Sequence, residues 1–127
     1  MVWRKLKRVK ELPLQRHVAR SRLVEIKWTP GSPEDIDRIT AYIAQDSFSR
    51  AVAFADRLFA STIRLERFPS SGSVVPEVGD PSIREVFENR YRLIYWIEGP
   101  STIWIRTIIH GHSVPPKQAL QGRKPKR

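Results

Sequence analysis

The chain has 127 residues, a net charge of +10 and no cysteine. This length supports one domain with a single modest core, and the lack of cysteine excludes disulfides, thiolate catalysis and cysteine-ligated zinc. It agrees with a reducing cytoplasm, where we expect the protein to act. No apolar run is long enough to span a bilayer, so we expect no membrane partner.

The positive charge is concentrated at the two ends of the sequence. Residues 1–22 carry eight Lys or Arg against one acid, a net charge of +7, and residues 110–127 carry five Lys or Arg and no acid, a net charge of +5. Residues 23–109 carry 10 basic and 12 acidic side chains, a net charge of −2. Basic tails attract phosphate without defining a site, so we expect nucleic acid to bind only indirectly or through these tails.

Residues 1–22 are interpreted as a basic, flexible extension, or as the product of a start codon placed too early. Trp3, Leu6 and Val9 recur at three-residue spacing before Pro13, which is compatible with a short amphipathic helix. We place the start of the fold near Leu23.

A strand and then a helix are predicted next. Leu23 to Trp28 alternates like a strand, and Thr29-Pro30-Gly31 ends it. Ser32 is the expected N-cap of a helix that has Pro33 in its first turn and ends near Asp46. The predicted apolar face of this helix consists of Ile36, Ile39, Tyr42 and Ile43.

A second helix follows at once and completes a helical hairpin. Asp46 or Ser47 is the expected N-cap, and Phe68-Pro69 is the expected end. Arg50, Arg57 and Arg64 recur every seven residues near its polar face, either as a solvated surface or as a contact surface for a partner. The predicted apolar stripe consists of Ala51, Phe54, Ala55, Leu58, Phe59, Thr62 and Leu65.

The second half of the chain predicts a sheet. Residues 69–82 are rich in Pro, Gly and Ser and read as a long loop without a strand. Residues 83–111 contain three runs of β-forming residues separated by two turns, which predicts an antiparallel meander. From residue 113 onward Pro and Lys dominate, which predicts a basic disordered tail. The domain is therefore expected to span residues 23–112.

The predicted fold class is α+β, with a helical hairpin packed on one face of a small antiparallel sheet in the order β-α-α-β-β-β. Arg92, Ile94 and Trp96 share one strand face. If the opposite face packs on the helices, these three side chains lie on an open face. The neighbouring strand adds either Trp104 with Arg106 or Ile103 with Ile105, because neither turn fixes the register.

Three segments, VVPEVGDPSIREVF, NRYRLIYWIE and IWIRTIIHGH, stand in an order and spacing that resemble the RelE/ParE superfamily of bacterial type II toxins, and the ParE branch in particular. With the first strand and the helices, the resemblance covers about residues 23–112. It implies a toxin that inhibits DNA gyrase by binding. It also implies a cognate antitoxin whose extended, helix-containing segment covers the toxin in a hetero-oligomeric, operator-binding complex.

The other branch of that superfamily implies a ribosome-dependent messenger RNA endonuclease. Arg92 matches the position of an arginine that RelE-like nucleases use, Arg84 lies where they keep basic residues, and His110 or His112 could act as acid and base. The position of a second catalytic arginine falls near Ser113, however, and no tyrosine follows Tyr95. The sequence therefore leans against an enzyme, and an inactive relative remains a third reading.

Both histidines also have a purely structural interpretation. His110 would be a half-buried residue at the end of the last strand, and His112 an exposed residue of the tail. An arginine beside tryptophan on an open sheet face could stack bases, shield the sheet or bind an antitoxin, and we favour the last. We expect no cofactor and no metal site. The predicted contact residues are Arg84, Arg92, Trp96, Trp104 and Arg106.

Overall fold

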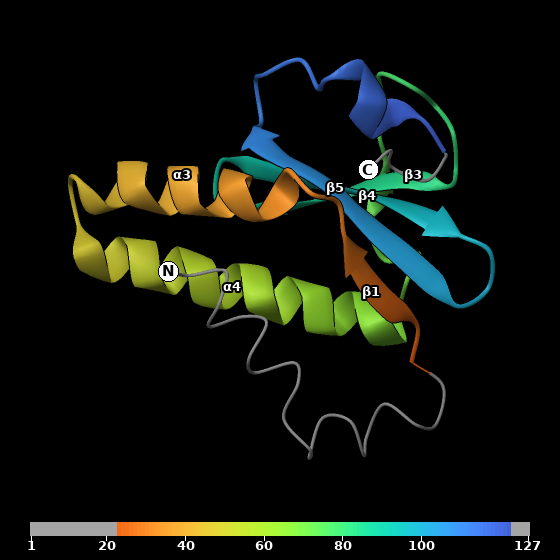
Figure 1. The fold of residues 1–127 in the computed structure, drawn as a ribbon, viewed down its shortest axis with the longest axis horizontal. Coiled ribbons are helices and arrows are strands. Elements are labelled where there is room, and N and C mark those ends of the chain that lie inside the picture. The colour runs from red at the N-terminus through yellow and green to blue at the C-terminus, as the bar shows by residue number, and fades with distance from the viewer. Residues whose placement is uncertain (1–22, 123–127) are drawn as a thin grey trace.

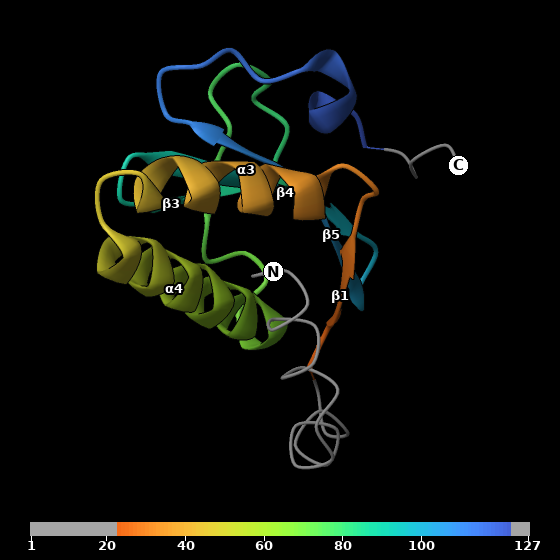
Figure 2. The same cartoon turned by 60° about the vertical axis from the view of Figure 1, so that its left-hand side comes forward.

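The computed structural model describes residues 23–122; our predictions for residues 1–22 and 123–127 lie outside this part. The elements are β1 (Glu25–Trp28), α3 (Ser32–Ala44), α4 (Phe48–Arg67), β2 (Ser73–Val74), β3 (Ile83–Glu88), β4 (Tyr91–Glu98), β5 (Thr102–His110) and the short 3₁₀ helix η1 (Lys117–Leu120). Two helices lie side by side along one face of the sheet (Figures 1 and 2). The α+β class and the order β-α-α-β-β-β are confirmed.

The sheet has five strands in the order β1-β5-β4-β3-β2. The predicted meander is present as the antiparallel pairs β3–β4 and β4–β5. β1 pairs with β5 in parallel, so the sheet is mixed and not purely antiparallel. The predicted loop contains β2, a two-residue strand that pairs with β3 and extends the sheet at that edge.

The start of α3 differs from the prediction by one residue. Gly31 occupies the N-cap position and Ser32 is the first helical residue. Ser32 is fully buried, and its hydroxyl donates to the carbonyl of Thr29 at 2.8 Å. The predicted cap therefore closes the turn that connects β1 to the helix, instead of capping the amides of the first helical turn.

The helical faces follow the predicted periodicity with one exception. Ser47 caps α4 by accepting a hydrogen bond from the amide of Arg50 at 3.2 Å, as predicted. The apolar stripe of α4 is buried except for Phe59, which is half-buried. Tyr42 is 65% exposed, because it lies on the same side of α3 as the exposed Arg38 and not over the sheet.

The main core lies between the helical hairpin and the sheet. Its buried members are Ile36, Ile39, Phe54, Leu58, Leu65, Leu93, Tyr95, Ile103, Ile105 and Ile108. No helix in the described part of the chain is both long enough and apolar enough to cross a membrane.

A β-bulge divides β5 and changes which residues face the helices. Tyr95 pairs with Ile105, whereas Ile94 pairs with Thr107, so Arg106 is an extra residue. Before the bulge, odd-numbered residues of β5 point into the main core; after it, the even-numbered Ile108 does. The inserted residue thus keeps one face of the strand apolar along its length.

Candidate functional site

The sheet face opposite the helices is covered, which contradicts our expectation of an open face. Arg92 is 3% exposed, Ile94 is buried completely and Trp96 is 9% exposed. The loop before β3 and the segment after β5 lie on this side of the sheet (Figures 1 and 2). Val75 from that loop and Leu120 from that segment join a second apolar cluster with Ile94 and Trp96.

The segment after β5 is partly ordered, in contrast to the predicted tail. Within residues 113–122, Pro115 and Ala119 are buried and η1 forms. Gly122 lies against the indole of Trp96 so closely that a Cβ added there would come within 2.9 Å of Nε1. Despite its Pro- and Lys-rich composition, this segment buries Pro115 and Ala119 and packs Leu120 against the second apolar cluster.

The register left open by the sequence is resolved in favour of Trp104 with Arg106. Trp96 and Trp104 are direct partners across β4 and β5. The guanidinium of Arg106 lies 5.9 Å from the Trp96 ring centre and donates to the carbonyl of Gln118. The Lys27 ammonium lies 5.3 Å from the Trp104 ring centre. Both cations lie over indole rings, and the contact of Arg106 with Gln118 ties the segment after β5 to the sheet.

Arg92 is held between two carboxylates. Its Nε donates to Glu85 Oε1 at 2.6 Å, and its two terminal nitrogens donate to Glu77 at 2.9 and 2.8 Å. Hydrogen bonds to Glu77 are the main reason that the pKa of Arg92 is raised above its usual value. The same contact lowers the pKa of Glu77. The arginine thus attaches the loop that contains Glu77 to the sheet.

Arg84 also makes structural contacts. Its Nε donates to the carbonyl of Pro81 at 2.8 Å, and Nη1 donates to the carbonyl of Gly72 at 2.9 Å. The hydroxyl of Tyr95 holds the same loop by accepting from the Gly72 amide at 3.0 Å and donating to the Pro69 carbonyl at 2.7 Å. Burial raises the pKa of this tyrosine. Arg84 and Arg92, the two arginines of the endonuclease alternative, therefore both anchor the loop between α4 and β3.

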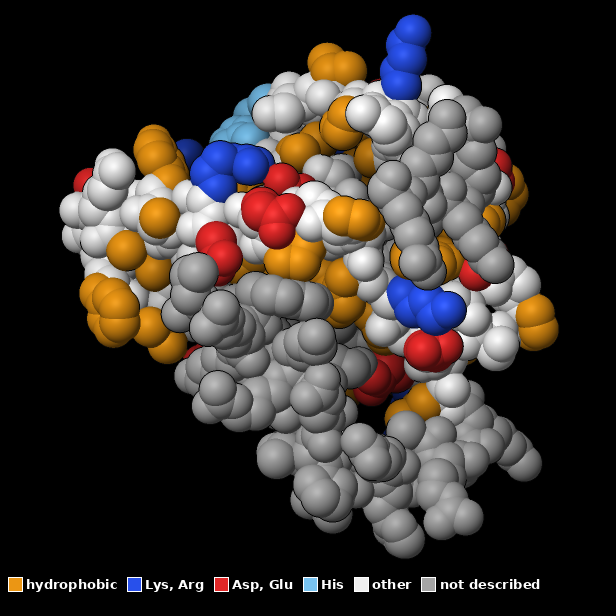
Figure 3. Space-filling model, viewed as in Figure 1, with side chains coloured by type: hydrophobic (Ala, Val, Ile, Leu, Met, Phe, Trp, Pro, Cys, Tyr) orange, Lys and Arg blue, Asp and Glu red, His pale blue; other side chains and the backbone are white. Residues whose placement is uncertain are grey.

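The two histidines lie together at the end of β5, on the surface (pale blue in Figure 3). Their rings are 5.4 Å apart, and His110 also meets the Tyr91 ring edge-on at 5.6 Å. Nδ1 of His110 accepts the backbone N–H of His112 at 3.2 Å. Tyr91 and His110 are paired across the strands, and Tyr91 packs against the helix-side core, so this imidazole belongs to the face opposite that of Arg92.

The candidate nuclease residues do not lie together around one site that could hold a phosphate. Arg84 is opposite Tyr95, whose ring lies in the helix-side core, whereas Arg92 joins Glu85 on the other face. Their strand positions are three residues apart, or about 10 Å along β3. Within residues 23–122, no group of three or more His, Asp or Glu side chains is placed to hold a metal ion.

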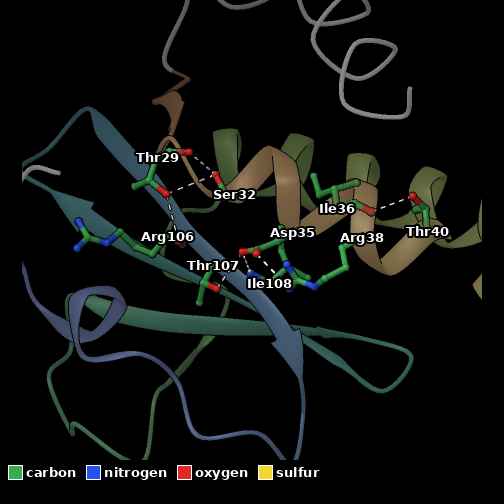
Figure 4. Close-up of polar contacts among 9 residues, drawn as sticks. All are labelled: Thr29, Ser32, Asp35, Ile36, Arg38, Thr40, Arg106, Thr107 and Ile108. Atoms are coloured by element: carbon green, nitrogen blue, oxygen red, sulfur yellow. Dashed lines mark hydrogen bonds and ion pairs between the residues drawn. The ribbon is translucent and has the colours of Figure 1, made fainter. Parts of the chain in front are cut away.

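Asp35 is a residue whose structural role the sequence reasoning missed. β1 ends before β5 does, and the freed edge of β5 is bound by side chains from the β1–α3 connection and from the first turn of α3 (Figure 4). The hydroxyl of Thr29 donates to the carbonyl of Arg106 at 3.1 Å. Oδ2 of Asp35 accepts the Thr107 hydroxyl at 3.0 Å and the Ile108 amide at 3.2 Å. Its place in the first turn of α3 indicates by itself only a charge near the helix N-terminus.

Glu77 and Glu85 were missed as well. The sequence offered one weak signal: two glutamates, one in PEVGDP and one in IREVF, precede the arginine of YRLIY. Only the sheet register and the path of the loop bring the two carboxylates to one guanidinium.

A family model described as the ParE toxin of the type II toxin–antitoxin system parDE matches residues 26–115. Among solved structures, a chain of the chromosomal ParDE system of P. aeruginosa aligns with a TM-score of 0.56 and 19% identity, covering 71% of this chain and 98% of that one. A chain of the RelBE2 toxin–antitoxin complex of Mycobacterium tuberculosis aligns with a TM-score of 0.47 and 20% identity, covering 69% and 98%. No significant match to a curated protein is found. The fold, and the match over most of the chain, place this protein in the ParE toxin family of type II toxin–antitoxin systems.

Proposed function

We propose that this toxin acts by binding, as an inhibitor of DNA gyrase, and that it cleaves no RNA. The observation that carries the proposal is the state of Arg92, which is 3% exposed and paired with two carboxylates. An arginine that stabilises a phosphorane must meet the phosphate directly. Here the guanidinium faces Glu77 and Glu85, whose negative charge would repel a phosphate.

The remaining nuclease candidates give little support to the alternative. Cleavage by a 2′-hydroxyl needs a base, an acid and a cation close to one phosphate. His110 and His112 are adjacent to each other, but the first lies on the helix side of the sheet, away from Arg92. A RelE-like messenger RNA endonuclease is therefore the second reading, and the experiment below is designed to detect it.

A cognate antitoxin is the second part of the proposal. The ParDE relative is described as a toxin–antitoxin system, and we infer the same arrangement here, with a hetero-oligomeric complex. The five predicted contact residues remain a proposal, but they now differ in whether a partner can reach them. Arg84 and Trp104 are partly exposed as folded, whereas Arg92, Trp96 and Arg106 would meet a partner only after the segments that cover them move.

Induction of the full chain in cells without antitoxin tests the mode of action. We expect loss of plasmid supercoiling and a DNA damage response, with intact messenger RNA ends. Cut transcripts before any DNA damage would overturn the proposal and establish the endonuclease reading. Cells that grow normally despite folded protein would indicate an inactive relative.

The variant His110→Ala with His112→Ala sharpens this test, because His112 is exposed, His110 is half-buried at the end of β5, and neither is a member of the main core. If the toxin inhibits gyrase through a surface that does not include the histidines, the double variant should still inhibit gyrase. A nuclease that uses an imidazole as acid or base would lose roughly 10²–10⁴-fold in cleavage rate. Gyrase supercoiling assays with the purified variant, beside transcript mapping, separate the two results.

A further inference from the structure

The arginines of α4 all lie on one stripe of the helix, which we call the arginine seam. Its positions follow one another at alternate spacings of three and four residues, so their side chains share one side of the helix. All of these side chains are exposed except that of Ala53, which is half-buried. The arginine seam consists of Arg50, Ala53, Arg57, Ala60, Arg64 and Arg67.

The arginine seam carries more positive charge than the described residues around it neutralise. Arg57 has one carboxylate nearby, that of Glu88 on β3, at 3.9 Å from Nε, and half of the Arg57 side chain remains exposed. The other arginines of the seam form no ion pair with any residue from 23 to 122. The acids of α4 itself, Asp56 and Glu66, lie about 100° and 180° around the helix from Arg57. The seam is thus a basic surface along the helix.

The most basic part of the sequence joins the fold beside one end of this seam. The amide of Val24 donates to the carbonyl of Glu66 at 2.9 Å, so the chain enters the described part next to the last turn of α4. Arg64 and Arg67 belong to that turn. Residues 1–22, which precede this point in the sequence, carry a net charge of +7. An anionic partner that binds the seam would therefore be attracted by both.

We propose that the arginine seam binds the phosphate backbone of duplex DNA. Exposed cations that neutralise phosphates release bound counterions, which is the main source of affinity at low salt. Seam arginines that are seven residues apart stand two helical turns, or about 10 Å, from each other. Three phosphate steps of one DNA strand cover about the same length along the duplex axis. The alanines between the arginines carry only methyl groups, so the sugar–phosphate backbone can approach the helix closely.

The composition of the seam favours a duplex over a single strand. Proteins bind single-stranded nucleic acids largely by stacking the bases on aromatic side chains. The seam contains no aromatic residue, and Phe48 and Phe59 lie on roughly the opposite side of α4 from Arg57. Contacts to phosphates alone carry no sequence information, so we expect binding without sequence preference. The choice of DNA over RNA rests on the proposed function, because gyrase acts on duplex DNA.

The test measures binding of the full chain to a short mixed-sequence DNA duplex by fluorescence anisotropy, between about 50 and 200 mM salt. The slope of the logarithm of the binding constant against the logarithm of the salt concentration reports how many phosphates are contacted. Arg50→Gln with Arg64→Gln should reduce the magnitude of this slope by about two, one for each phosphate contact removed. Circular dichroism of the variant verifies that the helices are intact.

Matched variants separate the seam from net charge. Arg38→Gln with Lys117→Gln removes the same charge from exposed positions outside the seam and should leave the slope unchanged. Residues 1–22 are identical in both double variants, so their contribution cancels from the comparison. Ala60→Glu places a repelling charge within the seam and should weaken DNA binding, whereas Ala41→Glu makes the same change at an exposed position of α3 and should not.

The outcomes are distinct. A slope that the seam variant shares with the wild type would assign DNA binding to the tails and overturn this inference; gyrase inhibition by the wild type, measured separately, would still decide the proposed function. Tighter, seam-dependent binding to an RNA duplex of the same sequence would overturn the choice of DNA. If the seam variant loses binding to polyglutamate but keeps the slope on DNA, the seam is a surface for acidic proteins and the inference is wrong.

Discussion

Arg92 carries a full positive charge at a position almost closed to water, and such a charge is stable only when it is paired. Glu85 is itself buried, whereas Glu77 is partly exposed at the loop. The three groups form one unit, in which Glu85 accepts from Nε, Glu77 accepts from both terminal nitrogens, and Nη2 lies within 2.8 Å of both carboxylates. At the residue scale, the role of this arginine therefore follows from its partners and not from its place in a motif.

Removal of the arginine alone should be costly. We expect Arg92→Met to lower the free energy of unfolding by about 3–5 kcal/mol, because it leaves the buried Glu85 carboxylate unpaired. Glu85→Leu combined with Arg92→Met should recover most of the loss, since apolar replacement of a buried pair is often neutral. Urea unfolding measures both, with the exposed Arg64→Met as the control. A double variant no more stable than the single one would contradict this account.

At low pH, protonation of Glu77 should break its contact with Arg92 and release the loop between α4 and β3. Because the folded-state pKa of Glu77 is lowered, its contribution to stability is present above the unfolded-state pKa and is lost as the pH falls through the lowered value. The loop should therefore detach from Arg92 only at a pH below the range in which an ordinary glutamate titrates. Titration of the Glu77 side-chain carboxyl carbon by NMR provides the measurement. A midpoint at or above the ordinary glutamate value would show that the pair does not form in solution.

At the scale of elements, the junction between α3 and β5 shows how a short edge strand is completed. β1 supplies four residues of pairing to a nine-residue partner. Thr29 and Asp35 then satisfy backbone and hydroxyl groups that the strand leaves without a neighbour. The carboxylate replaces part of a missing strand and fixes the N-terminal end of α3 against the sheet.

Loss of this carboxylate should loosen the helix. Asp35→Ala removes the acceptor for the Ile108 amide and the Thr107 hydroxyl, and we expect a loss of about 2–3 kcal/mol in the free energy of unfolding. Asp35→Asn should cost less, because its amide oxygen can still accept a hydrogen bond. Glu34→Ala, in the same helical turn but exposed, is the matched control. Equal losses for Asp35→Ala and Glu34→Ala would refute a specific anchor.

At the scale of the whole molecule, the sheet is a middle layer and not one wall of an open groove. The helical hairpin covers one face, and the loop before β3 together with the segment after β5 covers the other. The second cover is thinner, with Val75 and Leu120 as its apolar contributions. Surface available to partners therefore lies on the outer sides of the helices and at the strand ends.

The packing of residues 113–122 on the sheet can be tested by observing the indole of Trp96. Leu120→Lys places a charge in the second apolar cluster, so residues 113–122 should detach and the indole N–H of Trp96 should become accessible to water. We expect a shifted Nε1–H resonance and stability lowered by about 1–3 kcal/mol. Gln118→Lys adds the same charge at an exposed position and should change neither. Identical spectra for the two variants would contradict the packing of η1 on the sheet.

The sequence alone determined the two helices, β1 and the three strands of the meander in their order, because these depend on local periodicity and capping, whereas β2 and η1 were not predicted. The three-four spacing of α4 and the three strands from residue 83 onward were predicted correctly, and Ser47 was one of the two N-caps that we expected. The family resemblance also came from the sequence, and the family model that matches residues 26–115 confirms it.

The tertiary structure alone decided which side chains are accessible, because accessibility depends on segments distant in sequence. Alternation along β4 placed Arg92 with Trp96 correctly on one face, but it could not show that Val75 and Leu120 close that face. Nor could spacing reveal that Glu77 and Glu85 meet one guanidinium. Such contacts arise where a loop without periodicity is laid across a sheet, and no local pattern records that path.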